Sequence, residues 1–477
     1  MRKRARRARG RRAPAATVLV VNMIPKSLSG EEHQDSEPTI AVNPSDPSQI
    51  AGSAFTPDPG GGPRAPIYVS TDGGRTWRLN SIVPGNDPGS GTNDITLHFG
   101  GTSNVLYAGI LRPTSSDDTR LNVLRATDYT APAPMTVLLD RSSGGIDQPY
   151  VRATTVASGP DKGKDRVYVG DNYSTLASGR TATIDQSLDA AARRPVFKSV
   201  RIESRATPGQ DGPPVRPAVH ADGTVYAVFH AWRTFNDRTG AGVADIVVVR
   251  DDHGGTGVAP LTDLIDVADG KVGVRVVQGA KFNFDGFLGL QRTGGDVSLA
   301  VDPTDSDRVY LAYNDDQGPI YMLHLLRSTD RGRTWSSDLR THQNALNPAV
   351  AVNSNGTVGL LYQRLTGTGA AERWVTTLET QNQHGGPWHS LVLATTPAST
   401  PAKEFDPYLG DYDYLTAVGK DFYGVFSANN TPRKSNFPHG VTFQRNANFA
   451  TGTLLDVDNV TPVKPSIDPF FFKVTSP

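Results

Sequence analysis

The chain carries the octapeptide STDGGRTW at residues 70–77, and the same pattern returns as STDRGRTW at residues 328–335. These residue types suit a tight turn between two strands, because an Asp carboxylate accepts bonds from turn amides and Gly adopts positive φ. The Trp that ends each octapeptide supplies a large ring to pack between sheets. We therefore predict two structural turns and no catalytic role for their aspartates. The key residues of these turns are Ser70, Asp72, Gly74 and Trp77 in the first, and Ser328, Asp330, Gly332 and Trp335 in the second.

The sequence around the octapeptides repeats seven times. Each copy has a short apolar strand, a polar turn and a second apolar strand, and a further apolar pair follows it. The first pairs occupy residues 39–55, 95–111, 150–173, 217–232, 297–315, 348–364 and 414–430. Examples of the following pairs lie in residues 67–83, 121–140, 244–250, 321–339 and 373–394. Weakened octapeptides stand at the equivalent place in residues 126–128, 187–189 and 251–254.

Four antiparallel strands in each of several repeats predict an all-β propeller. Seven blades are the first choice and six the second. Unrelated hairpins in sandwich domains are the alternative that the regular phase of the repeats disfavours. A propeller has to close its ring to avoid exposed sheet edges. Either residues 17–24 before the first copy or residues 466–474 after the last supply the missing outer strand of the closing blade.

Composition excludes several other classes of protein. The 477 residues contain no Cys, which rules out disulfides and thiol nucleophiles. No run of 18 apolar residues is present to span a membrane as a helix. The 48 basic and 48 acidic side chains cancel, but eight of the basic ones lie in residues 1–12. The remaining body is therefore mildly acidic. Most of its acids are Asp and only seven are Glu, which favours turns over long helices.

The octapeptides resemble the Asp-box, or bacterial neuraminidase repeat, of sialidase-like propellers. The resemblance implies that glycans are recognised on the face opposite the Asp-boxes, where the inner strands begin and the second and third strands connect. It also implies an extracellular or periplasmic location. Sialidases of this kind use three arginines that grip a carboxylate, a Tyr nucleophile activated by Glu, and an Asp acid/base. This chain departs from them, because its nearest match to their F/Y-R-I-P motif is Pro-Arg-Ala-Pro at residues 63–66.

The residues that open the inner strands are polar and mostly acidic, which predicts a negative mouth for the axial channel. They are Asp35, Glu37, Asp94, Asp147, Gln148, Arg216, Asp296, Asn347, Asp411 and Asp413. Loops after the second strands add arginines and aromatic rings that suit sugars. The predicted substrate-binding residues are Arg112, Arg216, Arg233, Arg364, Trp232, Asp296, Asp406, Tyr408 and Asp411. Asp406 and Tyr408 belong to an F-D-x-[F/Y]-L-G motif at residues 405–410 that also occurs at residues 284–289. The two copies either form matched parts of the rim of a binding site or pack the loops between blades against the core.

Three functions stay open at this point. The first is sialidase-type exo-glycosidase chemistry with Asp147, Glu404 and Tyr412 as the catalytic candidates. The second is a glycosidase that uses Asp147 with Asp296 or Asp411 across the channel. The third is a lectin-like or protein-binding propeller without catalysis. A glycan or glycoconjugate is the expected partner, and we expect a monomer.

We expect no cofactor. The spacing of Asp302, Asp305 and Asp307 resembles that of a calcium-binding cluster. They occupy a turn that every copy has, however, so a turn without a metal ion is favoured. The chain shows no specific nucleic-acid motif. Residues 1–16 are a basic arm for which a passive tail, an atypical export signal and nonspecific polyanion binding are the three interpretations. Residues 17–477 are expected to form the single propeller.

Overall fold

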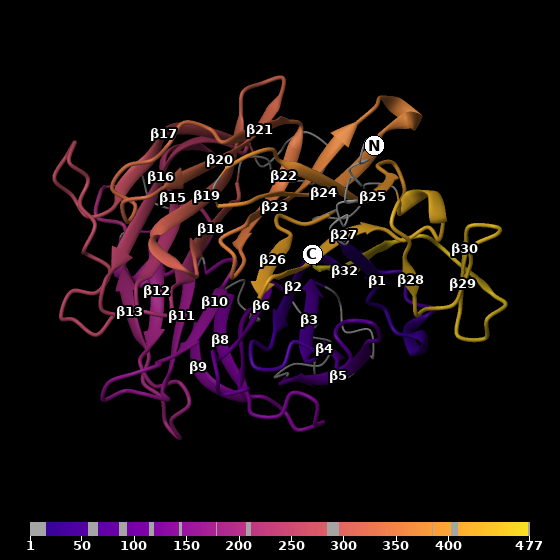
Figure 1. Cartoon of the computed structure of the whole chain (residues 1–477), viewed down its shortest axis with the longest axis horizontal. Coiled ribbons are helices and arrows are strands. Elements are labelled where there is room, and N and C mark those ends of the chain that lie inside the picture. The colour runs from indigo at the N-terminus through magenta and orange to yellow at the C-terminus, as the bar shows by residue number, and fades with distance from the viewer. Residues whose placement is uncertain are drawn as a thin grey trace, which may run out of the picture.

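The structure, a computed structural model, describes residues 16–55, 65–84, 93–113, 119–142, 146–177, 179–206, 211–283, 295–383, 385–401 and 409–475. Seven β-sheets are arranged around a central axis (Figure 1). The predicted all-β propeller with seven blades is thereby confirmed. Among the described residues, no helix is long and apolar enough to cross a membrane.

Six blades contain four consecutive strands each, ordered from the axis outward. Blade 1 is β2 (Ser36–Val42), β3 (Ile50–Phe55), β4 (Ala65–Ser70) and β5 (Arg78–Val83). Blade 2 is β6 (Ile95–Phe99), β7 (Leu106–Pro113), β8 (Thr119–Ala126) and β9 (Thr136–Ser142). Blade 3 is β10 (Tyr150–Thr155), β11 (Asp165–Asn172), β12 (Ala182–Ser187) and β13 (Lys198–Arg201).

Blade 4 is β14 (Val215–Val219), β15 (Val225–Asn236), β16 (Ala241–Asp251) and β17 (Val274–Asn283). Blade 5 is β18 (Val297–Asp302), β19 (Asp305–Asp316), β20 (Tyr321–Ser328) and β21 (Arg340–Gln343). Blade 6 is β22 (Ala345–Val352), β23 (Val358–Thr366), β24 (Arg373–Gln381) and β25 (His389–Pro397). Short 3-10 turns η1 (Lys26–Leu28), η2 (Ser174–Leu176), η3 (Gly369–Ala371) and η4 (Lys434–Asn436) lie in the connections.

Blade 7 closes the ring with both ends of the chain. Its order is β26 (Tyr414–Val418), β27 (Asp421–Asn429), β32 (Ile467–Thr475), β1 (Thr17–Asn22) and β28 (Thr442–Phe443). β32 pairs antiparallel with β27 and with β1. The two terminal segments predicted as alternatives are therefore both used, β32 as the third strand and β1 as the fourth. The inner strand β26 lies beside the inner strand β2 of blade 1, so the circle is complete.

Apolar side chains of neighbouring sheets interdigitate and form the core between blades. Ile67 and Val69 of β4, for example, pack with Leu97 and Leu106 of blade 2, and all four are fully buried. Each strand thus needs apolar residues on the faces that meet adjacent sheets, which explains the regular apolar pairs of the sequence.

The connection between β27 and β32 forms an insertion that the repeat pattern did not predict. It contains a small sheet of β29 (Ala447–Asn448), β30 (Thr453–Leu455) and β31 (Pro462–Val463), which lies outside the ring in Figure 1. Arg445, at its base, donates to both carboxylate oxygens of Asp468 in β32, at 3.1 and 2.9 Å. It also donates to the carbonyl oxygens of Ser29 and Glu31. This buried guanidinium ties the insertion to both ends of the chain.

The two octapeptides form matching turns between the third and fourth strands of blades 1 and 5. In the first, Asp72 Oδ1 accepts from the amides of Arg75 and Thr76, both at 3.0 Å. The Gly74 amide donates to Ser70 Oγ at 2.9 Å. The second turn repeats these contacts with Asp330 accepting from the Thr334 amide at 2.9 Å and Gly332 donating to Ser328 at 2.8 Å. Both aspartates are thus occupied by their own turns, as the turn interpretation expects.

The octapeptide turns also orient the propeller. The Gly73 amide donates to the carbonyl oxygen of Ser48, which lies in the turn between the first two strands of its blade. In blade 5, the Arg331 amide donates to the carbonyl oxygen of Asp307 in the same way. The octapeptide turns therefore share one face with the strand 1–2 turns. The starts of the inner strands lie at the other end of the axis, which we call the mouth.

Candidate functional site

The mouth collects buried polar residues from every blade. We call this set the mouth ring. It consists of Glu37, Asp94, Gln148, Arg216, Asp296, Asn347, Asp411, Tyr412 and Asp413, and each of these residues is less than a tenth exposed. Five carboxyl groups face one guanidinium in this set, so the mouth has a negative character. Most of the ring was predicted from the positions at which the inner strands begin.

A recurring X-Pro dipeptide places several of these side chains. Glu37, Gln148, Arg216 and Asn347 each precede a Pro at the start of an inner strand. Glu37, Gln148 and Asn347 have φ of 50°, 43° and 54°. A residue before Pro favours extended backbone, and residues other than Gly rarely adopt positive φ. Three blades therefore maintain the same costly conformation.

The pairing of the inner strands is irregular at two of these dipeptides. The register of β2 with β3 shifts between Ser36 and Thr39, and that of β22 with β23 shifts between Leu346 and Ala349. Such irregularities re-aim a side chain next to a site. Backbone strain that is retained at one place in several blades is typical of functional sites.

Hydrogen bonds join the ring across the axis. Arg216 Nη2 contacts Asp296 Oδ1 at 3.1 Å and donates to Gln148 Oε1 at 2.7 Å. The amide nitrogen of the Gln148 side chain in turn donates to Asp411 Oδ2 at 2.9 Å. The backbone amide of Asp411 donates to Glu37 Oε1 at 3.1 Å. Residues of blades 5, 4, 3, 7 and 1 are thus linked in one chain of contacts.

Tyrosine rings lie beneath the arginine. The guanidinium carbon of Arg216 is 4.6 Å from the ring centre of Tyr150 and 5.3 Å from that of Tyr412. Tyr412 donates its hydroxyl proton to Asp94 Oδ1 at 3.1 Å. Tyr150 was not predicted as a site residue. Its place as the first residue of an inner strand, directly after Gln148-Pro149, is the signal that would have indicated it.

Burial raises the pKa of two acids and one tyrosine of the ring. It raises the pKa of Asp296 to about 6, although the nearby Arg216 works in the opposite direction. Burial also raises the pKa of Asp413 well above its usual value, and the charge of Asp296 adds to this effect while a backbone bond from Ser427 opposes it. The pKa of Tyr412 is raised by burial and then by the charges of Asp94 and Glu37. Burial thus favours the protonated form of Asp296 and Asp413 and the neutral phenol of Tyr412.

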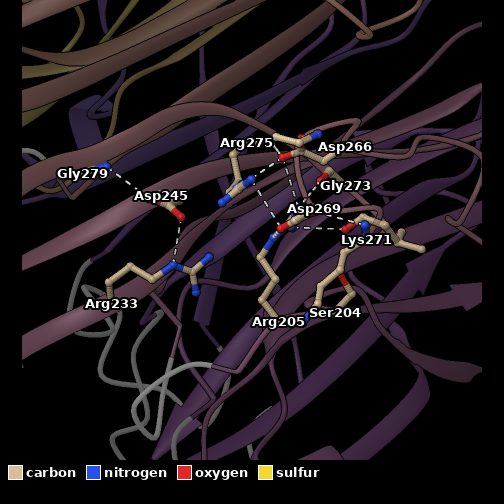
Figure 2. A network of polar contacts seen from close by, with 12 residues as sticks. Ser204, Arg205, Arg233, Asp245, Asp266, Asp269, Lys271, Gly273, Arg275 and Gly279 are labelled. Atoms are coloured by element: carbon tan, nitrogen blue, oxygen red, sulfur yellow. Dashed lines mark hydrogen bonds and ion pairs between the residues drawn. The ribbon is translucent and has the colours of Figure 1, made fainter.

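Arg112 and Arg233, two of the other predicted arginines, contact residues outside the mouth ring. Arg233, in β15, contacts Asp245 Oδ2 at 2.9 Å and lies 3.7 Å from Glu203. Figure 2 shows this pair beside a second cluster in which Arg205 and Arg275 contact Asp266 and Asp269. Arg112 donates to the carbonyl oxygen of Pro84. Arg364 is exposed on β23. These contacts anchor Arg112 and Arg233 within or beside their own blades, whereas Arg216 takes part in the contacts of the mouth ring.

Two further predicted residues, Asp147 and Trp232, have contacts with residues outside the ring. Asp147 lies next to Gln148, and its carboxylate is 3.8 Å from Arg180. Trp232 is buried and stacks on Phe235 and Phe282, with ring centres 4.4 and 4.8 Å apart. Glu404, Asp406, Tyr408 and the motif at residues 284–289 lie outside the described residues.

The predicted turn at Asp302 holds no gathered set of metal ligands. Asp302 accepts from the Thr304 amide at 2.9 Å and pairs with Arg308 at 2.7 Å. Asp305 pairs with the same arginine at 3.2 Å, whereas Asp307 lies 3.6 Å from Arg331. In the described part of the chain, no group of three or more acidic or His side chains is placed to hold a metal ion.

Comparison with known proteins gives only distant structural matches. The sequence matches no protein-family model and no curated protein. The solved structures that match include a protein of unknown function from Dyadobacter fermentans, with 10% identity, coverage of 96% of this chain and 99% of that one, and a TM-score of 0.45. They also include the α-L-arabinofuranosidase Arb93A of Fusarium graminearum, with 13% identity, coverage of 95% and 97%, and a TM-score of 0.43.

A third match is the Hadza microbial sialidase Hz136, with 16% identity, coverage of 80% of this chain and 71% of that one, and a TM-score of 0.40. Glycoside hydrolases are thus among the structural neighbours of this chain.

Proposed function

We propose that the mouth ring binds a neutral glycan and hydrolyses a glycosidic bond with a pair of carboxyl groups, Asp296 as the proton donor and Asp411 as the base or nucleophile. One observation supports this best. Residues with strained backbone before Pro, from three blades, lie at the same end of the axis as buried acids from four blades. Glycoside hydrolysis needs one protonated and one ionised carboxyl group near the same bond.

Asp296 suits the role of the acid. Its pKa of about 6, raised by burial, leaves a useful protonated fraction near neutral pH. The contact with Arg216 fixes the orientation of its carboxyl group. Asp411 suits the second role, because Gln148 and Glu37 hold its side chain and its backbone amide in place.

The charge of the ring favours a neutral sugar over a sialic acid. A sialoside brings a carboxylate, which would meet five acidic groups and a single arginine that already contacts Asp296. A tyrosine nucleophile also needs easy ionisation, whereas the pKa of Tyr412 is raised. The octapeptide turns, with their matching hydrogen bonds, support the proposal that the chain is a divergent member of the sialidase-like propellers.

Binding without catalysis is the second candidate function. The observation in its favour is that the arginine and the amide of the ring are engaged with other ring residues, as in a structural network. A lectin-like site needs donors and acceptors for hydroxyl groups but no poised acid.

The test is a panel of aryl glycosides of neutral sugars, assayed together with an aryl sialoside and a glycan array. We expect release of the aryl group from a neutral glycoside, with a rate that falls as the pH rises above about 6. Asp296→Asn and Asp411→Asn should each lower kcat at least about 100-fold. Asp458→Asn, an exposed acid of the insertion, is the control and should retain activity.

Two results would contradict the proposal, one its neutral substrate and the other its enzyme activity. If only the sialoside is hydrolysed, the substrate is an anionic sugar and the proposed neutral substrate is wrong. Array binding that depends on Asp296 and Asp411, with no hydrolysis of any glycoside, would make the protein a lectin.

A further inference from the structure

A cavity lies on the propeller axis at the end opposite the mouth. It has a volume of about 250 Å³ and is lined by the inner strands of blades 2 to 7 and by the turns that follow three of them. Its walls are mostly small or apolar side chains such as Ala218, Leu299, Val350 and Ala417. The volume corresponds to roughly eight water molecules, so it suits a small ligand.

Arg152 is the charged residue in the wall of this cavity. It belongs to β10 and donates to the hydroxyls of Tyr150, at 2.9 Å, and of Tyr414. A weaker contact of 3.4 Å leads to the carbonyl oxygen of Val151. These contacts use three of the five N–H hydrogens of the guanidinium.

The charge of Arg152 has no acidic counterpart nearby. The residues that line the cavity include no Asp or Glu. Among the described residues, no carboxylate lies within 4.0 Å of Arg152, in contrast to Arg216 at the mouth. Because arginine stays protonated in proteins, the partly buried Arg152 keeps its positive charge in the cavity wall.

His98 shares the cavity wall and does not supply the missing charge. Its Nδ1 lies 2.7 Å from the carbonyl oxygen of Phe99. Burial, followed by the nearby charge of Arg152, lowers the pKa of His98 to about 3. A neutral imidazole beside a guanidinium leaves the cavity with a net positive charge of one.

We propose that this axial cavity is a binding site for one small oxyanion, a carboxylate, phosphate or sulfate group, held by the guanidinium of Arg152. A planar guanidinium with unused N–H groups matches two oxygens of such an anion. The residues that line the cavity include no acid that would repel the anion. The site lies at the other end of the axis from the mouth ring and does not depend on the proposed glycan chemistry.

The experiment is calorimetric titration of the full chain with sodium acetate, phosphate and sulfate, each at constant ionic strength set with chloride. We expect saturable binding of one anion per chain for at least one probe. Comparison of the three probes tells a carboxylate ligand from a phosphate or sulfate ligand. Arg152→Gln should weaken this binding at least about tenfold, the effect of one charged hydrogen bond.

Two other variants complete the test. Ala417→Leu fills the cavity from a partly exposed wall position without touching the arginine, and it should also weaken binding at least about tenfold. If Arg152→Gln does not fold, the binding measured with Ala417→Leu tests the anion site instead. Arg333→Gln removes a positive charge from an exposed octapeptide turn on the same face and should bind like the wild type.

Absence of saturable binding of all three probes to the wild-type chain would overturn the proposal. Binding by Arg152→Gln or Ala417→Leu within twofold of the wild type would overturn it as well.

Discussion

Gly74 sits where the octapeptide turn of blade 1 meets the closing strand β32, and we expect Gly74→Ala to weaken the ring. Its φ is 84°, a conformation that costs an L-residue about 1–2 kcal/mol. A Cβ at Gly74 would also lie 2.0 Å from Cε1 of the buried Phe471 ring. Overpacking of this kind costs about 1–3 kcal/mol, so the total loss of unfolding free energy should be about 2–5 kcal/mol.

The neighbouring Gly73 provides the matched control. Its φ is 74°, but a Cβ there would meet only the end of the Arg75 side chain, at 3.6 Å. Gly73→Ala should therefore cost about 1–2 kcal/mol, the backbone strain alone. Gly332, the equivalent of Gly74 in blade 5, would place its Cβ 3.3 Å from Leu264 Cδ2, and its Ala variant should lie closer to Gly73→Ala.

The assay is urea unfolding followed by tryptophan fluorescence and by circular dichroism. Free energies are comparable only where the two signals report one transition. Phe471→Leu in the Gly74→Ala background should recover part of the loss, because it removes the ring that the Cβ meets. Equal unfolding free energies for Gly73→Ala and Gly74→Ala would refute the reasoning.

Two further predictions concern the closing blade and blade 6. Deletion of residues 1–22 removes β1 and the burial of Val20 and Val21, so it should lower the unfolding free energy by at least about 3 kcal/mol relative to a chain that lacks only residues 1–15. An unchanged urea midpoint would contradict this role of β1. Glu379 is buried, and despite that burial His342, Arg340 and Ser390 hold its pKa below the usual value. Its contribution to stability is therefore present above the pKa of about 4.3 in the unfolded chain and is lost as the pH falls further. Glu379→Gln should cost about 3–5 kcal/mol at pH 7 and less at pH 4 in the same assay, and a difference independent of pH would contradict the assignment.

The sequence predicted the blades because every strand has to bury apolar side chains against adjacent sheets. That requirement acts locally and repeats, so it is visible in each copy. The octapeptide turns were equally predictable, since Asp72 and Asp330 satisfy amides within a few residues of themselves. The mouth ring followed from the same logic, because residues at equivalent positions of radial repeats have to meet near the axis.

The contacts within the ring could not be predicted in the same way. The link from Arg216 through Gln148 to Asp411 joins blades 4, 3 and 7, and no local pattern specifies which side chains pair across an axis. Glu37, Gln148 and Asn347 have positive φ, whereas residues before Pro prefer extended backbone with negative φ. The sequence therefore predicts the wrong backbone conformation at these three positions.

The closing blade shows a third limit of sequence reasoning. Residues 17–24 and 466–474 were predicted as alternatives because each alone reads as one edge strand. Their simultaneous use in blade 7 depends on pairing between the two ends of the chain. The insertion of β29, β30 and β31 was missed because strands of two or three residues carry no periodic signal.

The pairing of β1 with β32 has a consequence for how the protein is made. Asn22 donates to Asp468, a residue 446 positions later in the chain. At about 5–20 residues per second, a ribosome needs roughly 20–90 s to synthesise the stretch between them. During that time β1 lacks the strand β32 with which it finally pairs, and the apolar side chains of Val20 and Val21 lack their final cover. The circle is therefore completed only after β32 has been synthesised, so β1 waits for its partner while the strands between the two are made.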